Sequence, residues 1–157
     1  MDHALIATLF GKRFGPILSA RFQILCSRQL VFGGDPPTTD RLQVRIFIRN
    51  DGKRVARFVQ LVLELPSDSV SDFRVNRGGV VVIDQLRPGR IARQYTDNEG
   101  DCYPQVDMSV LEIEFCITKR FFDEHHADPL IEWFLHADEM DPQLGTLSLK
   151  DMGTTLA

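Results

Sequence analysis

The sequence lacks any long apolar run, and it has few cysteines. Nothing in its 157 residues reaches the roughly 18 consecutive apolar residues of a membrane span. The three cysteines, Cys26, Cys102 and Cys116, include no C-x-x-C pair and no spacing typical of a zinc site. The short apolar run near the N-terminus follows an acidic residue and leads to no signal-peptide cleavage site. We therefore expect free thiols in a reducing compartment and a cytoplasmic protein that does not enter a membrane.

The signatures of several enzyme classes are also missing. There is no serine in a G-x-S-x-G elbow, no phosphate-binding P-loop and no dinucleotide-binding glycine fingerprint. Gly11-Lys12 and Gly33-Gly34 are too isolated to cradle a phosphate group. The net charge of −4 gives no overall attraction to nucleic acid or to an anionic membrane. These absences favour a non-catalytic protein without a cofactor, and they make nucleic acid an unlikely partner.

The composition that is present is that of an ordinary globular protein. Hydrophobic residues make up 43% and charged residues 25%, so the chain has enough apolar surface to form a core. A chain of this length buries roughly two-thirds of its unfolded surface without help from disulfides or metal. We expect one domain over residues 1–157, with an N-terminal arm or short helix over 1–14 and a flexible tail over 151–157.

The most regular pattern in the chain lies in residues 42–66. Apolar and polar residues alternate from Leu42 to Arg49, with Phe47 as the exception, which is the period of a half-buried strand. The residues Asn50-Asp51-Gly52 tolerate a tight reversal, and a second apolar run then returns and ends at Pro66. Val62 is apolar on the opposite parity of that run, so part of it is expected to be covered on both faces. The segment predicts a long β-hairpin.

Several further strands are predicted where apolar residues alternate or run together. They cover residues 17–26, 79–84, 91–95, 108–118, 129–137 and 146–150. The segment 129–137 is expected to be the antiparallel partner of 108–118, with a long turn or a single helical turn between them. Residues 67–72 are expected to be a polar connection. About eight strands, little helix and turn signals between each pair predict an all-β, antiparallel, immunoglobulin-like β-sandwich.

Two stretches resemble a known kind of module. Asn-x-Gly, the small residue Ala56 and an apolar run closed by Pro66 are similar to immunoglobulin-like β-sandwich modules that bacteria attach to other domains. Residues 131–145, IEWFLHADEMDPQLG, resemble the C-terminal part of certain β-rich domains. In bacterial ATP-binding proteins, those domains are C-terminal to Schlafen-type, AlbA-related DNA-binding domains. The resemblance implies a binding or regulatory accessory module in a bacterium. It supplies no catalytic residue.

The loops between the predicted strands suggest a cation site. If consecutive strands are antiparallel, alternate loops leave the same end of the sandwich, and this places four acidic loops at one end. Among them, residues 97–101 offer Asp97, Glu99 and Asp101 as oxygen ligands for calcium, which tolerates irregular geometry. The same residue types are ordinary turn formers, and the full calcium-loop pattern is absent. Both interpretations stay open.

The opposite end would then carry the basic residues of the remaining turns. They are Lys53 and Arg54 in the hairpin turn and Arg87 and Arg90 around a second turn. They could hold an acidic partner through charge-assisted hydrogen bonds, or they could be solvated charges that prevent edge-to-edge aggregation. Aromatic side chains that could stack on bases are scarce in these turns. Among binding roles, a protein partner or a fused domain is favoured over nucleic acid.

Two more groups of polar residues bear on function. Adjacent side chains point in different directions, so His125 and His126 are expected in a solvated loop rather than in one metal site. His136, Glu132 and Glu112 have the chemistry of an acid–base site, which would require a concave pocket around all three. The function predicted from the sequence is a non-catalytic protein-interaction or regulatory accessory module. The alternative is a β-sandwich that binds calcium or an anionic ligand at its loop end, and an enzyme is the third hypothesis.

Overall fold

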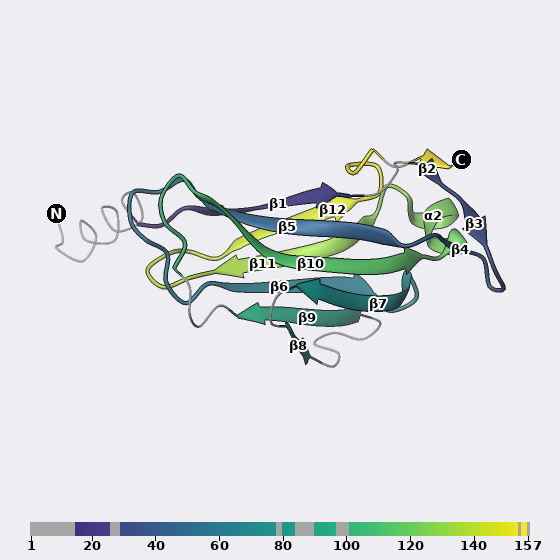
Figure 1. Cartoon of the computed structure of the whole chain (residues 1–157), viewed down its shortest axis with the longest axis horizontal. Coiled ribbons are helices and arrows are strands. Elements are labelled where there is room, and N and C mark those ends of the chain that lie inside the picture. The colour runs from purple at the N-terminus through teal and green to yellow at the C-terminus, as the bar shows by residue number, and fades with distance from the viewer. Residues whose placement is uncertain are drawn as a thin grey trace, which may run out of the picture.

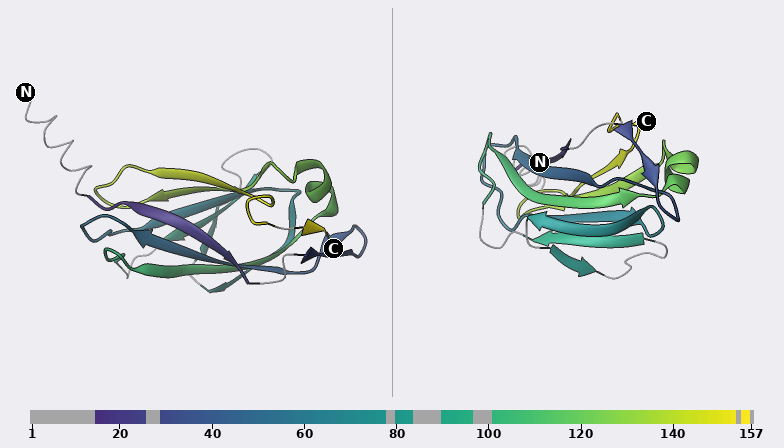
Figure 2. Two further views of the ribbon diagram at one scale, coloured as in Figure 1. Left: turned by 90° about the horizontal axis from the view of Figure 1, so that it is seen from above. Right: turned by 45° about the vertical axis from the view of Figure 1, so that its right-hand side comes forward.

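The computed structural model describes residues 15–25, 29–77, 80–83, 90–96, 101–153 and 155–156. Within these residues the chain is mostly β, with one short helix. Two antiparallel sheets pack against each other as a sandwich (Figures 1 and 2). The predicted fold class is therefore confirmed. The expected arm or helix over residues 1–14 lies outside the described residues.

The first sheet has four strands in the order β1-β5-β10-β7. Their bounds are β1 Leu18–Ile24, β5 Leu42–Asn50, β10 Asp107–Ile117 and β7 Val70–Arg77. All three neighbouring pairs are antiparallel. Every second residue of the central strand β5 is buried, from Leu42 to Asn50, as the alternation in the sequence predicts.

The second sheet has five strands in the order β12-β11-β6-β9-β8. Their bounds are β12 Gln143–Ser148, β11 Pro129–His136, β6 Gln60–Pro66, β9 Arg90–Thr96 and β8 Val80–Ile83. Two small ribbons add to the sandwich: β2 Gln29–Leu30 with β13 Thr155–Leu156, and β3 Phe32–Gly33 with β4 Thr38–Thr39. The helix α2, Lys119–His125, links β10 to β11.

Apart from β8, β9 and the two small ribbons, the strand order is that of immunoglobulin-type sandwiches. In that architecture the first, second, fifth and fourth strands form one sheet, and the third, sixth and seventh form the other. Here β1, β5, β10 and β7 form the first set, and β6, β11 and β12 form the second. The pair β8 and β9 comes between the fourth and fifth strands in sequence and extends the second sheet beside β6.

The core lies between the inner faces of the two sheets. Its largest fully buried side chains are Phe115, Ile46, Ile48, Leu61, Leu63, Leu65, Leu111, Ile113, Ile117, Leu130, Ile131 and Leu135. Burying each aliphatic side chain stabilises the fold by roughly 1.5–3 kcal/mol. The helix α2 closes one end with buried Phe121 and Phe122, and Figure 1 shows it beside β3 and β4. Thr118 caps this helix by accepting a hydrogen bond from Phe121 N at 3.3 Å.

The long hairpin predicted over residues 42–66 is wrong. Strands β5 and β6 belong to different sheets, and residues 51–59 cross from one sheet to the other. In this crossing the backbone of Ala56 pairs with that of Cys102 through two hydrogen bonds of 2.9 Å. Two alternating strands can share a core either side by side or face to face. The alternation alone therefore does not distinguish a hairpin from two packed sheets.

Two other sequence predictions also need correction. Residues 67–72 are not only a polar connection, because a turn at 67–69 leads directly into β7. The segment 129–137 is not the partner of 108–118, because α2 carries the chain to the other sheet, where β11 pairs with β6 and β12. The flexible tail expected over residues 151–157 stays a prediction, and the described residues there form a turn and the strand β13, which pairs with β2.

The described residues contain one short helix and two cysteines. In the part of the chain that the structure describes, no helix is long and apolar enough to cross a membrane. Cys102 and Cys116 are free thiols, as expected, and both are buried, whereas Cys26 lies outside the described residues. Burial raises the pKa of the Cys116 thiol, so this side chain is held in its unreactive protonated form.

Candidate functional site

The predicted separation of acidic and basic loops is wrong. Lys53 and Arg54 lie in the crossing after β5, at the same end of the sandwich as Asp101 and Glu139. There Arg54 Nη1 is 3.8 Å from Glu139 Oε2. Arg90 begins β9 opposite Pro66, at the other end. The reason is β7, which adds one more traverse of the sandwich, so each later loop leaves from the end opposite to the predicted one.

The predicted ligand residues are only partly within the described structure. Asp97, Glu99 and Arg87 lie outside the described residues, as does the side chain of Arg90. Asp101 is partly buried, and in the described ranges no three His, Cys, Asp or Glu side chains are close enough to hold a metal ion. Calcium binding by Asp97, Glu99 and Asp101 stays a prediction, and so does partner binding by the basic residues.

The structure does not bring the hypothetical acid–base residues together. Glu112 lies on the outer face of the four-stranded sheet, where its carboxylate is 3.2 Å from Arg45 Nη2. Glu132 and His136 lie on strand β11 of the other sheet, with the outward parity. The outer faces of a sandwich point in opposite directions, so no single pocket contains all three side chains.

The two adjacent histidines have separate surroundings, as expected, although His125 belongs to α2 rather than to a loop. His125 Nδ1 is 2.8 Å from the carboxylate of Asp128, and both side chains are about half exposed or more. The His126 ring instead packs on Phe122, with the ring centroids 4.6 Å apart. The two imidazoles therefore do not form a common metal site.

The outer face of the four-stranded sheet is a ladder of paired charges. Arg21 is 2.9 Å from Asp107, and Arg49 is 2.8 Å from Asp51. Glu114 accepts hydrogen bonds from the side chains of Asn76 and Gln43, and these lower its pKa, the bond from Asn76 more than the bond from Gln43. These pairs satisfy most of the charges on this face within the chain itself.

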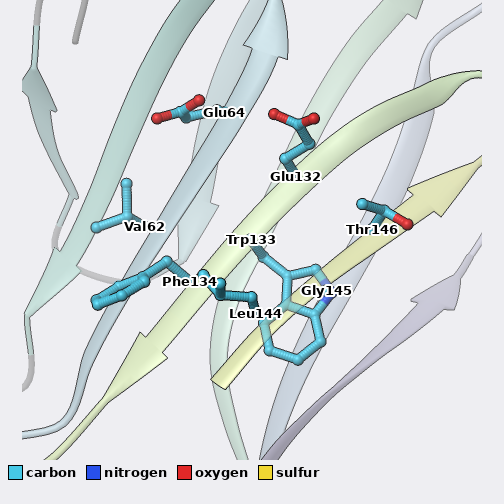
Figure 3. A pocket seen from close by; sticks show the side chains of 8 residues that line it. All are labelled: Val62, Glu64, Glu132, Trp133, Phe134, Leu144, Gly145 and Thr146. Atoms are coloured by element: carbon cyan, nitrogen blue, oxygen red, sulfur yellow. The ribbon is translucent and has the colours of Figure 1, made fainter. Parts of the chain in front are cut away.

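The outer face of the five-stranded sheet is different, because it contains an open hollow of about 750 Å³ (Figure 3). Its lining residues are Val62, Glu64, Glu132, Trp133, Phe134, Leu144, Gly145 and Thr146. They come from the adjacent strands β6, β11 and β12. We call this feature the hollow.

Most of the lining forms two rows that run across the strands. In the apolar row, Phe134 lies between its direct partners Leu144 and Val62. In the acidic row, two residues along each strand, Glu132 lies between its partners Thr146 and Glu64. Leu144 is 74% exposed, the most exposed large hydrophobic side chain among the described residues.

Trp133 and Gly145 complete the lining at the edge of the sheet. Trp133 packs against the core, as its parity in the sequence indicates, and its indole lies beside Gly145 (Figure 3). A Cβ atom at residue 145 would lie 2.7 Å from the indole Nε1 and still closer to two ring carbons. Glycine is therefore required here by the space that the indole occupies.

No model of a known protein family matches this chain, and no curated protein matches its sequence. The chemistry of the surface itself must therefore indicate the function. The hollow presents aliphatic and aromatic carbon next to two carboxylates. Such a surface can bind an apolar group and a cationic group side by side.

Sequence reasoning missed the hollow, although one signal for it was visible. Val62 interrupts the polar parity of its strand, and the sequence predicted that this part of the strand is covered on both faces. In the structure Val62 lines the open hollow. Phe134 and Leu144 are similarly apolar at outward positions, but only the strand register aligns them with Val62.

Proposed function

We propose that this chain is a non-catalytic protein-interaction or regulatory accessory module, which binds a protein partner or a fused domain through the hollow. The observation that carries the proposal is the apolar row of Val62, Phe134 and Leu144. The solvent-facing side of an antiparallel sheet normally carries polar residues. A contiguous apolar patch on such a face is typical of an interaction site.

The resemblance seen in the sequence supports the same role. Residues 131–145, which are similar to the end of the β-rich domains behind Schlafen-type, AlbA-related domains, include most of β11 and the start of β12. These two strands supply the larger part of the lining of the hollow. We therefore propose a bacterial, cytoplasmic accessory domain whose outer sheet face contacts the protein that it regulates or accompanies.

An affinity capture from a lysate of the source cells tests this proposal. The hollow variant carries Phe134→Ser and Leu144→Ser, which remove two thirds of the apolar row. The matched control carries Val31→Ser and Tyr103→Ser, which remove exposed apolar side chains (57% and 58% exposed) that do not line the hollow. The melting temperature of each variant is measured first, to show that it is folded.

We expect a specific protein that the wild type and the control retain and that the hollow variant loses. A further variant, Lys53→Gln with Arg54→Gln, tests in the same experiment whether the basic crossing binds the partner. If all variants retain the same proteins, or if none retains a specific one, the hollow is not an interaction site and the proposal is wrong.

A further inference from the structure

We infer that the hollow binds an extended peptide segment, which pairs with the edge of β12 and carries an apolar residue and a lysine or arginine two positions apart. This inference rests on the proposed function and specifies the chemistry of the partner. It follows from the position of β12 at one end of the described sheet, from the two rows and from their charge.

Strand β12 is an edge that another strand can extend. It stands at one end of the five-stranded sheet, and among the described strands it pairs only with β11. Charged residues and proline protect edge strands from pairing with other strands. The six residues of β12, QLGTLS, include neither. By contrast, the edges of the other sheet carry Arg21 in β1 and Asp72 and Arg74 in β7.

The two rows determine which side chains of an added strand reach the hollow. A residue placed directly opposite Leu144 continues the apolar row, and one placed opposite Thr146 continues the acidic row. Because Leu144 and Thr146 are two positions apart, the matching side chains are also two positions apart, about 7 Å along the segment. This spacing holds whether the added strand is parallel or antiparallel.

The charge of the acidic row selects a basic segment. Glu132 and Glu64 are directly opposite each other, so two carboxylates lie next to each other in this row. A lysine or arginine opposite Thr146 is two strands, or roughly 10 Å between backbones, from Glu132. Its long side chain can cross the short threonine to reach the carboxylate. An acidic side chain in that place would add a third negative charge.

A second copy of this chain is a poorer occupant of the same edge. If β12 paired with β12 of another molecule, the uncharged strand QLGTLS would face each acidic row. No cation from that strand would reach Glu132 or Glu64. Self-association through this edge would therefore contradict the inference.

The test is a selection of displayed peptides on the complete chain. A library of random ten-residue peptides is selected on the immobilised wild type, on Glu132→Lys and on the matched control Glu112→Lys. Glu112 is an outward strand carboxylate on the opposite sheet, so its inversion changes net charge equally but far from the hollow. Melting temperatures establish that all three proteins are folded, and sedimentation gives their oligomeric state.

We expect the wild type and Glu112→Lys to enrich peptides with an apolar residue and a Lys or Arg two positions apart, the order depending on whether the segment is parallel or antiparallel to β12. The Glu132→Lys protein should instead enrich Asp or Glu in place of the Lys or Arg. One enriched peptide, synthesised with Lys and with Glu, should bind the wild type with affinities that differ on the order of tenfold. Its amide chemical-shift changes should centre on β11 and β12.

Several outcomes would overturn the inference. They are no enrichment, an enriched pattern that does not change in Glu132→Lys, binding that maps away from β12, or a dimer that closes this edge. The capture experiment separates these failures from failure of the proposed function. If the hollow variant loses a captured partner while the peptide pattern fails, the module proposal stands and only the chemistry of the segment is wrong.

Discussion

Replacing Asn50 by alanine should destabilise the protein far more than an ordinary polar substitution. Asn50 is fully buried at the end of β5, and its amide joins three segments of the chain. Its Nδ2 donates to the carbonyl oxygens of Arg54 at 2.6 Å and of Cys102 at 3.0 Å. Its Oδ1 accepts from the backbone N–H groups of Gly52 at 3.0 Å and of Ile17 at 3.2 Å.

The expected magnitude follows from these four hydrogen bonds. A typical intramolecular hydrogen bond contributes about 0.5–1.5 kcal/mol, and a buried group left without a partner costs about 1–3 kcal/mol. The bonds to Cys102 and Gly52 are buried, whereas those to Arg54 and Ile17 are partly buried, where water can replace the lost amide. At the low end of these ranges, two buried groups left without a partner cost about 2 kcal/mol together, and two lost partly buried bonds cost about 1 kcal/mol more. We therefore expect Asn50→Ala to lower the free energy of unfolding by about 3–5 kcal/mol, which is a large part of the stability of an average domain.

Chemical denaturation at neutral pH measures this loss directly. The control is Gln23→Ala, which removes an exposed amide from the outward parity of β1 and should change the free energy of unfolding by less than about 0.5 kcal/mol. If Asn50→Ala lowers the free energy of unfolding by less than about 1 kcal/mol, the amide does not hold the crossing together and the reasoning is refuted.

Two further predictions concern the packing at Gly145 and the titration of Glu114. Gly145→Ala should lower the free energy of unfolding by about 1–3 kcal/mol, because its Cβ overlaps the Trp133 indole. Gly33→Ala, which has nothing within 4 Å of the new Cβ, should be neutral or slightly stabilising in the same denaturation assay. Hydrogen bonding by Asn76 lowers the pKa of Glu114 below 4.5 in the folded state, so this interaction stabilises the protein above that pH and is lost as the pH falls through the lowered pKa. Asn76→Ala should therefore raise the pKa of Glu114 in an NMR titration.

Each of these two predictions has an outcome that would contradict it. A Gly145→Ala protein as stable as Gly33→Ala would mean that the indole moves aside without cost. An unchanged Glu114 pKa in Asn76→Ala would mean that the Asn76 amide does not hold the ionised carboxylate. The melting temperature at neutral pH controls for unfolding of either variant.

Apart from β7 and the two-residue strands, the protein's strands and its β-sandwich class can be predicted from the sequence, because both depend on local patterning. Alternation in residues such as Leu42, Val44 and Ile46 requires only that one face of a strand is buried, whatever lies opposite. The same holds for Ile113 and Phe115 in β10, which the structure buries as expected. These residues have a local period of two, and no distant contact is needed to recognise it.

The pairing of the strands and the position of the loops were decided only in the tertiary structure. The strand β7 was not predicted, because it lacks a regular alternation of apolar and polar residues. Its pairing with β10 contains register shifts, and it lies at the edge of its sheet with exposed residues. Without β7, the ends from which later loops leave are assigned wrongly. Asn50 similarly has the sequence signature of an exposed turn former, and only the crossing between sheets buries it.

The candidate site depends on register, which the sequence leaves open. Val62, Phe134 and Leu144 are far apart in the chain, and single apolar residues on a surface are ordinary. A shift of one residue in the pairing of β11 with β6 or β12 would separate them and would also separate Glu132 from Glu64. The amino-acid sequence therefore determined that two sheets would pack around a shared apolar core. Tertiary pairing decided that an apolar row and an acidic row would meet in one hollow.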